Sequence, residues 1–131
     1  MLTTTHAFSG FTVEDTEVAL AFYRDVLGID ARLNEMGIIE FTHGGTHVIV
    51  YPKPGGEPAG YTVLNFVVPD IDAAVDELEA AGVTLERYPG MHQDDRGIMR
   101  DRAAGRGPDI GWFTDPSGNI FSIIGEDSRP E

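Results

Sequence analysis

The chain has 131 residues, the usual size of one domain, and such a domain buries roughly 65 to 70% of its unfolded surface without a disulfide or metal. It contains no cysteine, which excludes disulfide scaffolds, thiolate metal sites and cysteine nucleophiles. Its formal net charge of -13, from 22 acidic residues against 9 lysines and arginines, repels nucleic acid and anionic membranes. We therefore expect no nucleic-acid or membrane partner.

The first residues have neither the basic start nor the apolar run of a secretory signal. Nowhere do about 18 apolar residues follow one another, the length that a membrane-spanning helix needs. Together with the absence of cysteine, these features predict a cytoplasmic protein.

The first half of the chain predicts one strand, one helix and three more strands. The strand covers residues 6–13. Apolar residues at the spacing of an amphipathic helix follow it, namely Val18, Ala19, Phe22, Tyr23, Val26 and Leu27. Gly28 is placed as the stop of this helix. The later strands are predicted over residues 30–34, 38–42 and 47–51.

The second half repeats this order. A strand over residues 61–68 precedes an amphipathic helix that begins after Asp70 and stops at Gly82. Further strands are predicted over residues 84–88, 110–114 and 120–124. The long Gly, Asp and Arg-rich stretch at residues 89–108 interrupts the repeat and is typical of a surface loop rather than a packed element.

The repeat predicts an α+β fold made of two βαβββ modules. Nothing in the sequence indicates a second core, so residues 1–131 are expected to form one domain. Module one covers residues 1–52, a Pro and Gly-rich linker covers residues 53–60, and module two covers residues 61–125.

Four motifs in this order resemble the vicinal oxygen chelate superfamily, whose members include glyoxalase I, extradiol dioxygenases, fosfomycin-modifying enzymes, epimerases and bleomycin-binding resistance proteins. The motifs are Val13-Glu14-Asp15, Ala21-Phe22-Tyr23-Arg24-Asp25-Val26-Leu27-Gly28, Val68-Pro69-Asp70-Ile71-Asp72-Ala73-Ala74-Val75 and Trp112-Phe113-Thr114-Asp115-Pro116-Ser117-Gly118-Asn119. The resemblance implies that the two modules form one cup-shaped domain with a mixed sheet.

The resemblance also implies where a metal would be bound. The family's ligand positions, on the first and last strands of the modules, correspond here to Phe8, Val50, Val63 and Ser122. A shift of one residue on the last strand of module one gives Ile49 or Tyr51 instead. Metal sites of this kind use imidazole or carboxylate donors, which none of these residues has. We therefore expect no metal and no other cofactor.

Alternation along the strands predicts which residues line the cup. These are Phe8, Gly10, Thr12, Val48, Val50, Val63, Asn65, Val67, Ile120, Ser122 and Ile124. Such an apolar wall with a few hydrogen-bonding groups is typical of a small-molecule pocket, and Asn65 and Ser122 are its most specific members. The alternative is that these side chains fill the cup.

Other residues admit two interpretations. Trp112 is either a stacking platform or core filler, and the loop arginines, Arg100 among them, either clamp an anionic ligand or pair with the protein's own carboxylates. His6, His43, His47 and His92 are either a displaced metal site or ordinary polar residues, and Glu40 is either a lone general base or solvent-facing.

The sequence thus predicts a metal-independent small-molecule-binding protein of the glyoxalase/bleomycin-resistance type, working as a homodimer, with an apolar or aromatic metabolite or antibiotic as ligand. No catalytic residue is assigned. The predicted ligand-binding residues are Phe8, Thr12, Val50, Val63, Asn65, Trp112, Ser122 and Arg100. The alternatives are a lyase, dioxygenase or isomerase that uses a displaced metal or acid-base chemistry alone, and an interaction module with a filled cup.

Overall fold

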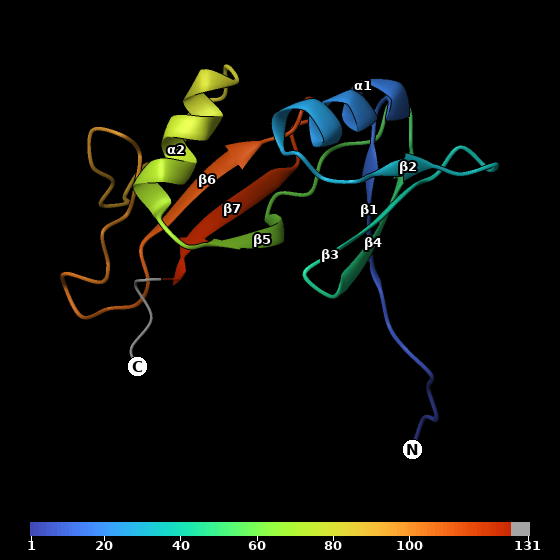
Figure 1. Cartoon of the computed structure of the whole chain (residues 1–131), viewed down its shortest axis with the longest axis horizontal. Coiled ribbons are helices and arrows are strands. Elements are labelled where there is room, and N and C mark those ends of the chain that lie inside the picture. The colour runs from blue at the N-terminus through green and yellow to red at the C-terminus, as the bar shows by residue number, and fades with distance from the viewer. Residues whose placement is uncertain (127–131) are drawn as a thin grey trace. The chain divides into compact units, whose positions relative to one another are not determined.

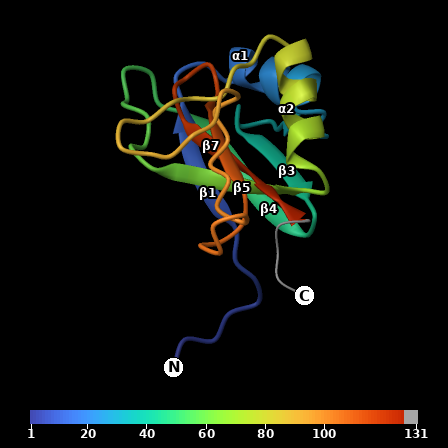
Figure 2. The same cartoon turned by 90° about the vertical axis from the view of Figure 1, so that its left-hand side faces the viewer.

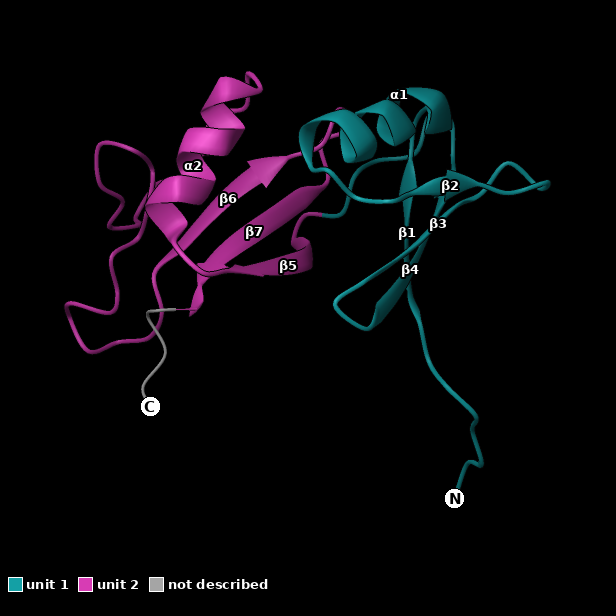
Figure 3. Cartoon of the chain, in the orientation of Figure 1, with its two compact units in different colours: residues 1–59 teal, residues 60–131 magenta. Residues whose placement is uncertain are grey.

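The structure of the protein is a computed structural model that describes residues 1–126. The chain divides into two compact units, residues 1–59 and residues 60–131 (Figure 3). Each unit combines a helical segment with a small sheet of parallel and antiparallel strands, which confirms the predicted α+β class (Figure 1). In the described part of the chain, no helix is long and apolar enough to cross a membrane.

The first unit has the predicted βαβββ order. Its elements are β1 (Ser9–Val13), α1 (Thr16–Ala21), a π-helical turn η1 (Phe22–Val26) that continues α1, β2 (Arg32–Leu33), β3 (Ile39–His43) and β4 (Thr46–Pro52). The sheet order is β1-β4-β3-β2, in which β1 runs parallel to β4 and the other neighbours are antiparallel.

Local chemistry fixes the two ends of the first helical segment. Asp15 caps its start, because a side-chain oxygen accepts hydrogen bonds from the backbone of Glu17 at 2.9 Å and Val18 at 3.3 Å. Gly28 follows its end with φ of +67°, a backbone conformation that glycine adopts without strain. The segment buries Tyr23, whose ring packs edge-on against Phe41 of β3 at 6.1 Å.

The second unit has one regular strand fewer than predicted. It consists of β5 (Thr62–Val68), α2 (Ile71–Ala80), β6 (Ile110–Thr114) and β7 (Ile120–Gly125), and its sheet order is β5-β7-β6. β5 runs parallel to β7, and β6 runs antiparallel to it. The helix again begins at an Asp cap and again stops before a glycine with positive φ, Gly82.

The strand predicted over residues 84–88 is wrong as a regular strand. The segment bonds to β6 through the backbone N–H of Glu86, which donates to the carbonyl of Trp112 at 2.7 Å. The side chain of Gln93 takes the place of further strand pairing, because it accepts from the backbone N–H of Tyr88 and donates to the carbonyl of Glu86, both at 2.8 Å.

The stretch at residues 89–108 has no helix and only isolated bridges, as a loop should. It is nevertheless anchored in the core, because the side chain of Ile98 is fully buried. The stretch is a loop as predicted, but it does not lie wholly on the surface, because Ile98 reaches the core. The buried side chain holds the loop against the unit and so brings its arginines within reach of α2.

Candidate functional site

One face of the second unit's sheet carries a row of polar and aromatic side chains. α2 lies across the other face (Figures 1 and 2), which contains the buried residues Phe113, Phe121 and Ile123. On the face away from α2, the strand register places Asn65 of β5 beside Ser122 of β7, and Ser122 beside Trp112 of β6. Neighbouring strands lie about 4.8 Å apart, so these three positions span roughly 10 Å. We call Asn65, Ser122 and Trp112 the Asn65 row.

The polar end of the Asn65 row is held in place by one hydrogen bond. Ser122 is fully buried, and its hydroxyl donates to the side-chain carbonyl of Asn65. The amide nitrogen of Asn65, an exposed residue, makes no hydrogen bond within residues 1–126. A fixed amide with two free N–H donors can recognise an acceptor on a small molecule.

The aromatic end of the row continues into the segment at residues 84–88, which was predicted as a strand. The ring of Tyr88 packs edge-on against the ring of Trp112, with centroids 5.7 Å apart. The Tyr88 hydroxyl is buried and has no hydrogen-bond partner among the described residues. Burial raises the pKa of Tyr88, and the nearby carboxylate of Glu86 raises it further. The phenol therefore stays protonated at neutral pH and can donate a hydrogen bond.

Glu86 completes this end of the row. Its carboxylate accepts a hydrogen bond from the hydroxyl of Thr114 at 3.3 Å. Our sequence reasoning missed both Glu86 and Tyr88. Strand alternation already places them on one face, opposite to the buried Leu85. What the sequence does not show is that this segment borders Trp112.

Val63 stands apart from the row. The pairing of β5 with β7 shifts here, since Thr62 pairs with Ile120 while Leu64 pairs with Phe121. Val63 therefore occupies a bulge and has no partner opposite it on β7.

In the first unit, the register places two of the predicted cup residues, Val48 and Val50, on the face opposite to the predicted one. Thr12 lies beside Tyr51, and Gly10 lies beside Ile49, on the face away from the core. Val50 instead lies beside Phe11 on the core face, and both Val48 and Val50 are fully buried. The prediction that Val48 and Val50 share a face with Phe8 and Thr12 is therefore wrong by one residue.

The same face of the first unit brings two further candidates together. The Nε2 atom of His47 lies 3.9 Å from a carboxylate oxygen of Glu40, whose other oxygen accepts from the side chain of Asn34 at 3.2 Å. The ring of Phe8, which is 54% exposed, lies 5.5 Å from that of His47 and 6.1 Å from that of His6. Glu40 thus has two polar neighbours that the sequence did not reveal.

The remaining histidines lie elsewhere, His43 in the β3–β4 hairpin and His92 exposed in the loop at residues 89–108. Within residues 1–126, no group of three or more His, Asp or Glu side chains is placed to hold a metal ion.

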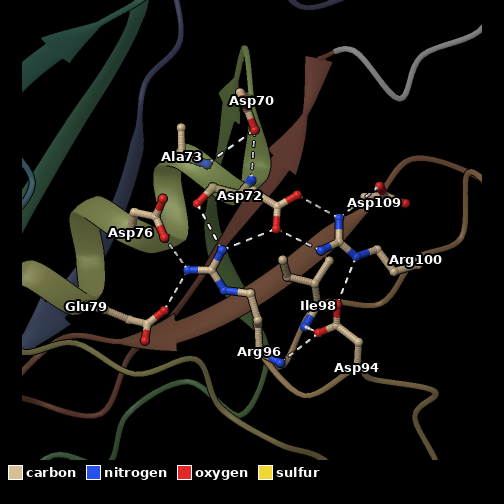
Figure 4. A network of polar contacts seen from close by, with 10 residues as sticks. All are labelled: Asp70, Asp72, Ala73, Asp76, Glu79, Asp94, Arg96, Ile98, Arg100 and Asp109. Carbon is tan, nitrogen blue, oxygen red and sulfur yellow. Dashed lines mark hydrogen bonds and ion pairs between the residues drawn. The ribbon is translucent and has the colours of Figure 1, made fainter.

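Two of the loop arginines, Arg96 and Arg100, bind carboxylates of their own unit (Figure 4). Arg100 contacts both oxygens of Asp72 on α2, at 2.8 and 3.0 Å, and Asp94 of the loop at 2.9 Å. Arg96 contacts Asp72, Asp76 and Glu79 of the same helix. Arg100, predicted to bind ligand, thus belongs to an ion-pair network with α2 and not to the Asn65 row.

The residues at the family's ligand positions do not fit a metal ion. Phe8, Val63 and the buried Val50 have no donor atom, and the hydroxyl of Ser122 is bound to Asn65. A shift of the family alignment by one residue puts Ile49 or Tyr51 at the position of Val50. Ile49 has no donor atom, and Tyr51 has only a phenol. The imidazole and carboxylate donors of such sites are missing at these positions.

Comparison with known proteins gives a family and a fold. A family model described as Glyoxalase/Bleomycin resistance protein/Dioxygenase superfamily matches residues 5–123. No curated protein matches the sequence significantly.

Solved structures are similar over nearly the whole chain. A member of the same superfamily from Sphaerobacter thermophilus is 27% identical, with 93% of this chain and 98% of that chain covered and a TM-score of 0.63. The fosfomycin resistance protein FosX from Listeria monocytogenes is 13% identical, with 98% and 100% covered and a TM-score of 0.67. A lactoylglutathione lyase from Agrobacterium tumefaciens is 20% identical, with 96% of each chain covered and a TM-score of 0.63.

Proposed function

Because the chain belongs to the Glyoxalase/Bleomycin resistance protein/Dioxygenase superfamily, also called the vicinal oxygen chelate superfamily, we propose that it is a metal-independent small-molecule-binding protein. Its ligand is an apolar or aromatic metabolite or antibiotic that binds on the Asn65 row. The observation that carries this proposal is the row itself, in which a fixed amide with free donors and a tryptophan stand at strand positions about 10 Å apart.

The chemistry of the row supports binding rather than metal-assisted catalysis. A tryptophan ring offers a large flat contact for an aromatic molecule, while Asn65 fixes its orientation through hydrogen bonds. The absence of imidazole and carboxylate donors at the ligand positions supports a metal-independent role.

The test uses Trp112, the only tryptophan of the chain, as a fluorescent reporter. A panel of aromatic metabolites and antibiotics, fosfomycin included, is titrated while Trp112 emission and thermal unfolding are recorded. A ligand at 100 times its Kd raises the free energy of unfolding by roughly 2.7 kcal/mol.

The matched variants are Asn65→Leu, which replaces the exposed amide of the row, and Thr46→Leu, which adds a similar side chain at an exposed position of β4. We expect the first to abolish binding and the second to leave it unchanged. Binding that survives Asn65→Leu would move the site away from the row.

We also propose that the protein is a cytoplasmic homodimer, since two-fold pairing is the commonest oligomeric arrangement. Sedimentation equilibrium of the full chain measures the mass, and a monomer across the micromolar range would contradict this part of the proposal.

A second candidate function is acid-base catalysis on the first unit, favoured by the Glu40 and His47 pair. Asn34 holds the Glu40 carboxylate, which in turn faces a ring nitrogen of His47. If this pair is catalytic, Glu40→Gln lowers turnover of a substrate found in the ligand panel by at least about 100-fold. An unchanged rate in Glu40→Gln would remove the pair from the chemistry.

A further inference from the structure

Glu86 is a half-buried carboxylate without a counterion. In the described part of the chain it forms no ion pair, and its one hydrogen bond comes from the neutral hydroxyl of Thr114. Its neighbour Arg87 donates instead to the backbone carbonyl of Asp95 at 2.6 Å. A positively charged partner stabilises a partly desolvated carboxylate, so the surroundings of the Glu86 side chain favour the binding of a cation.

Two aromatic rings flank the same corner. Trp112 and Tyr88 pack edge-on at an interplanar angle of 75°, and the backbone of Glu86 is hydrogen-bonded to that of Trp112. The faces of such rings attract cations, and tryptophan does so most strongly. A carboxylate beside two rings of this kind is a favourable place for an organic cation, whose apolar part contacts the rings while its charge faces the carboxylate.

The amide of Asn65 defines the rest of the ligand. Asn65 is exposed at the other end of the row, and within residues 1–126 its N–H donors are free while its oxygen is bound to Ser122. These donors fit an acceptor atom on the ligand. An anionic ligand is disfavoured, because Glu86 and the net charge of -13 repel it.

We propose that the ligand of the Asn65 row is an aromatic cation, whose positive group is held between Glu86, Trp112 and Tyr88. This inference rests on the proposed binding function and adds the charge of the ligand and the residues that select it. Glu86 is the specificity-determining residue.

The experiment compares three probes of similar size and different charge: benzyltrimethylammonium, benzyl alcohol and benzoate. Each is titrated against the full chain while Trp112 fluorescence is recorded. We expect the cation to bind at least about tenfold more tightly than the alcohol, and benzoate to bind most weakly.

Two variants that each remove one negative charge separate local recognition from overall charge. Glu86→Gln keeps an oxygen that can accept from Thr114, whereas Glu77→Gln changes an exposed residue of α2. The preference for the cation over the alcohol should fall at least about fivefold in Glu86→Gln and persist in Glu77→Gln. Circular dichroism of both variants establishes that they are folded.

The outcomes separate this inference from the proposed function. If benzyl alcohol and the cation bind equally, or if Glu86→Gln keeps the preference, the inference is overturned while small-molecule binding on the row stands. If no probe and no member of the wider ligand panel changes Trp112 emission, both fall. A change of emission with protein concentration alone would show that a second copy covers this face, and would also overturn the inference.

Discussion

Arg100 and Asp72 form a two-armed ion pair, in which Nη1 lies 3.0 Å from Oδ2 and Nη2 lies 2.8 Å from Oδ1. Asp72 belongs to the first turn of α2 and Arg100 to the loop at residues 89–108. Parallel hydrogen bonds of this kind combine charge with fixed geometry and are stronger than a single contact. The pair therefore fastens a loop without regular structure to the helix of its unit.

Replacing Arg100 by alanine should lower the free energy of unfolding by about 1 to 2 kcal/mol, because it removes the bonds to Asp72 and Asp94 from a partly exposed network. The matched control is Arg102→Ala, since the side chain of Arg102 is exposed and forms no ion pair within residues 1–126. Its effect should stay below about 0.5 kcal/mol. Urea unfolding measures both, and equal losses would show that the network contributes nothing.

The contribution of Arg100 should disappear in acid. Its hydrogen bonds lower the pKa of Asp72 below the ordinary 3.8. Burial raises the pKa of Asp94, but bonds from the Ile98 backbone and Arg100 outweigh this and lower it too. A carboxylate with a lowered folded-state pKa stabilises the fold fully above its unfolded-state pKa, and this stabilisation is lost as pH falls through the folded-state pKa.

The difference in stability between the unchanged protein and Arg100→Ala should therefore be constant near neutral pH and shrink below pH 3.8. Urea unfolding as a function of pH measures it. If the stability difference at a pH of about 3, below the ordinary pKa of both carboxylates, equals the difference at neutral pH, the role assigned to Asp72 and Asp94 is contradicted.

Gly97 should be the glycine of the loop that tolerates alanine least. Its φ is +91°, and a Cβ atom there would lie 2.9 Å from the Cβ of the buried Leu85. Gly90 has a similar φ of +84° but open space around it. Gly90→Ala should cost about 1 kcal/mol from backbone strain, and Gly97→Ala about 2 to 4 kcal/mol from strain and the clash together. Thermal unfolding of the two variants gives the comparison, and identical melting temperatures would mean that Leu85 moves aside freely.

Tyr88→Phe should stabilise the protein without ligand by about 1 kcal/mol, because it removes a buried hydroxyl that has no partner among the described residues and keeps the contact with Trp112. Tyr61→Phe is the control, since Tyr61 is 63% exposed and its hydroxyl is free to bond to water. Differential scanning calorimetry measures both. A less stable Tyr88→Phe variant would mean that this hydroxyl is satisfied after all.

The duplication, the helices and the hairpins were predictable from local signals. Asp15 and Asp70 cap the two helices, and Gly28 and Gly82 follow their ends in the positive-φ conformation that these sequence positions suggest. Asn65 and Ser122 were both predicted to line the cup, and the pairing of β5 with β7 places them beside each other.

What failed depended on contacts between distant segments. Val50 was predicted to line the cup. Alternation divides the residues of a strand into two sets but does not say which set faces the core, and only the pairing with Phe11 and Ile39 shows that Val50 does. The segment at residues 84–88 has strand-like residues. The side chain of Gln93, however, bonds to the backbone groups of Tyr88 and Glu86 that a neighbouring strand would otherwise bind. Glu86 and Tyr88 were not predicted as site residues for the same reason, since only their contacts with Trp112 make them candidates.

Because of the ion pairs between them, α2 and the loop at residues 89–108 cannot be exchanged independently with those of a relative. Asp72, Asp76 and Glu79 lie one helical turn apart along α2, so their like charges repel one another. Arg96 reaches all three, and the loop thereby acts as a built-in counterion for an acidic helix. The helix and the loop therefore depend on each other. Grafting α2 into a relative without this loop would leave a row of uncompensated negative charges. Deleting the loop here would require neutral residues at these helix positions.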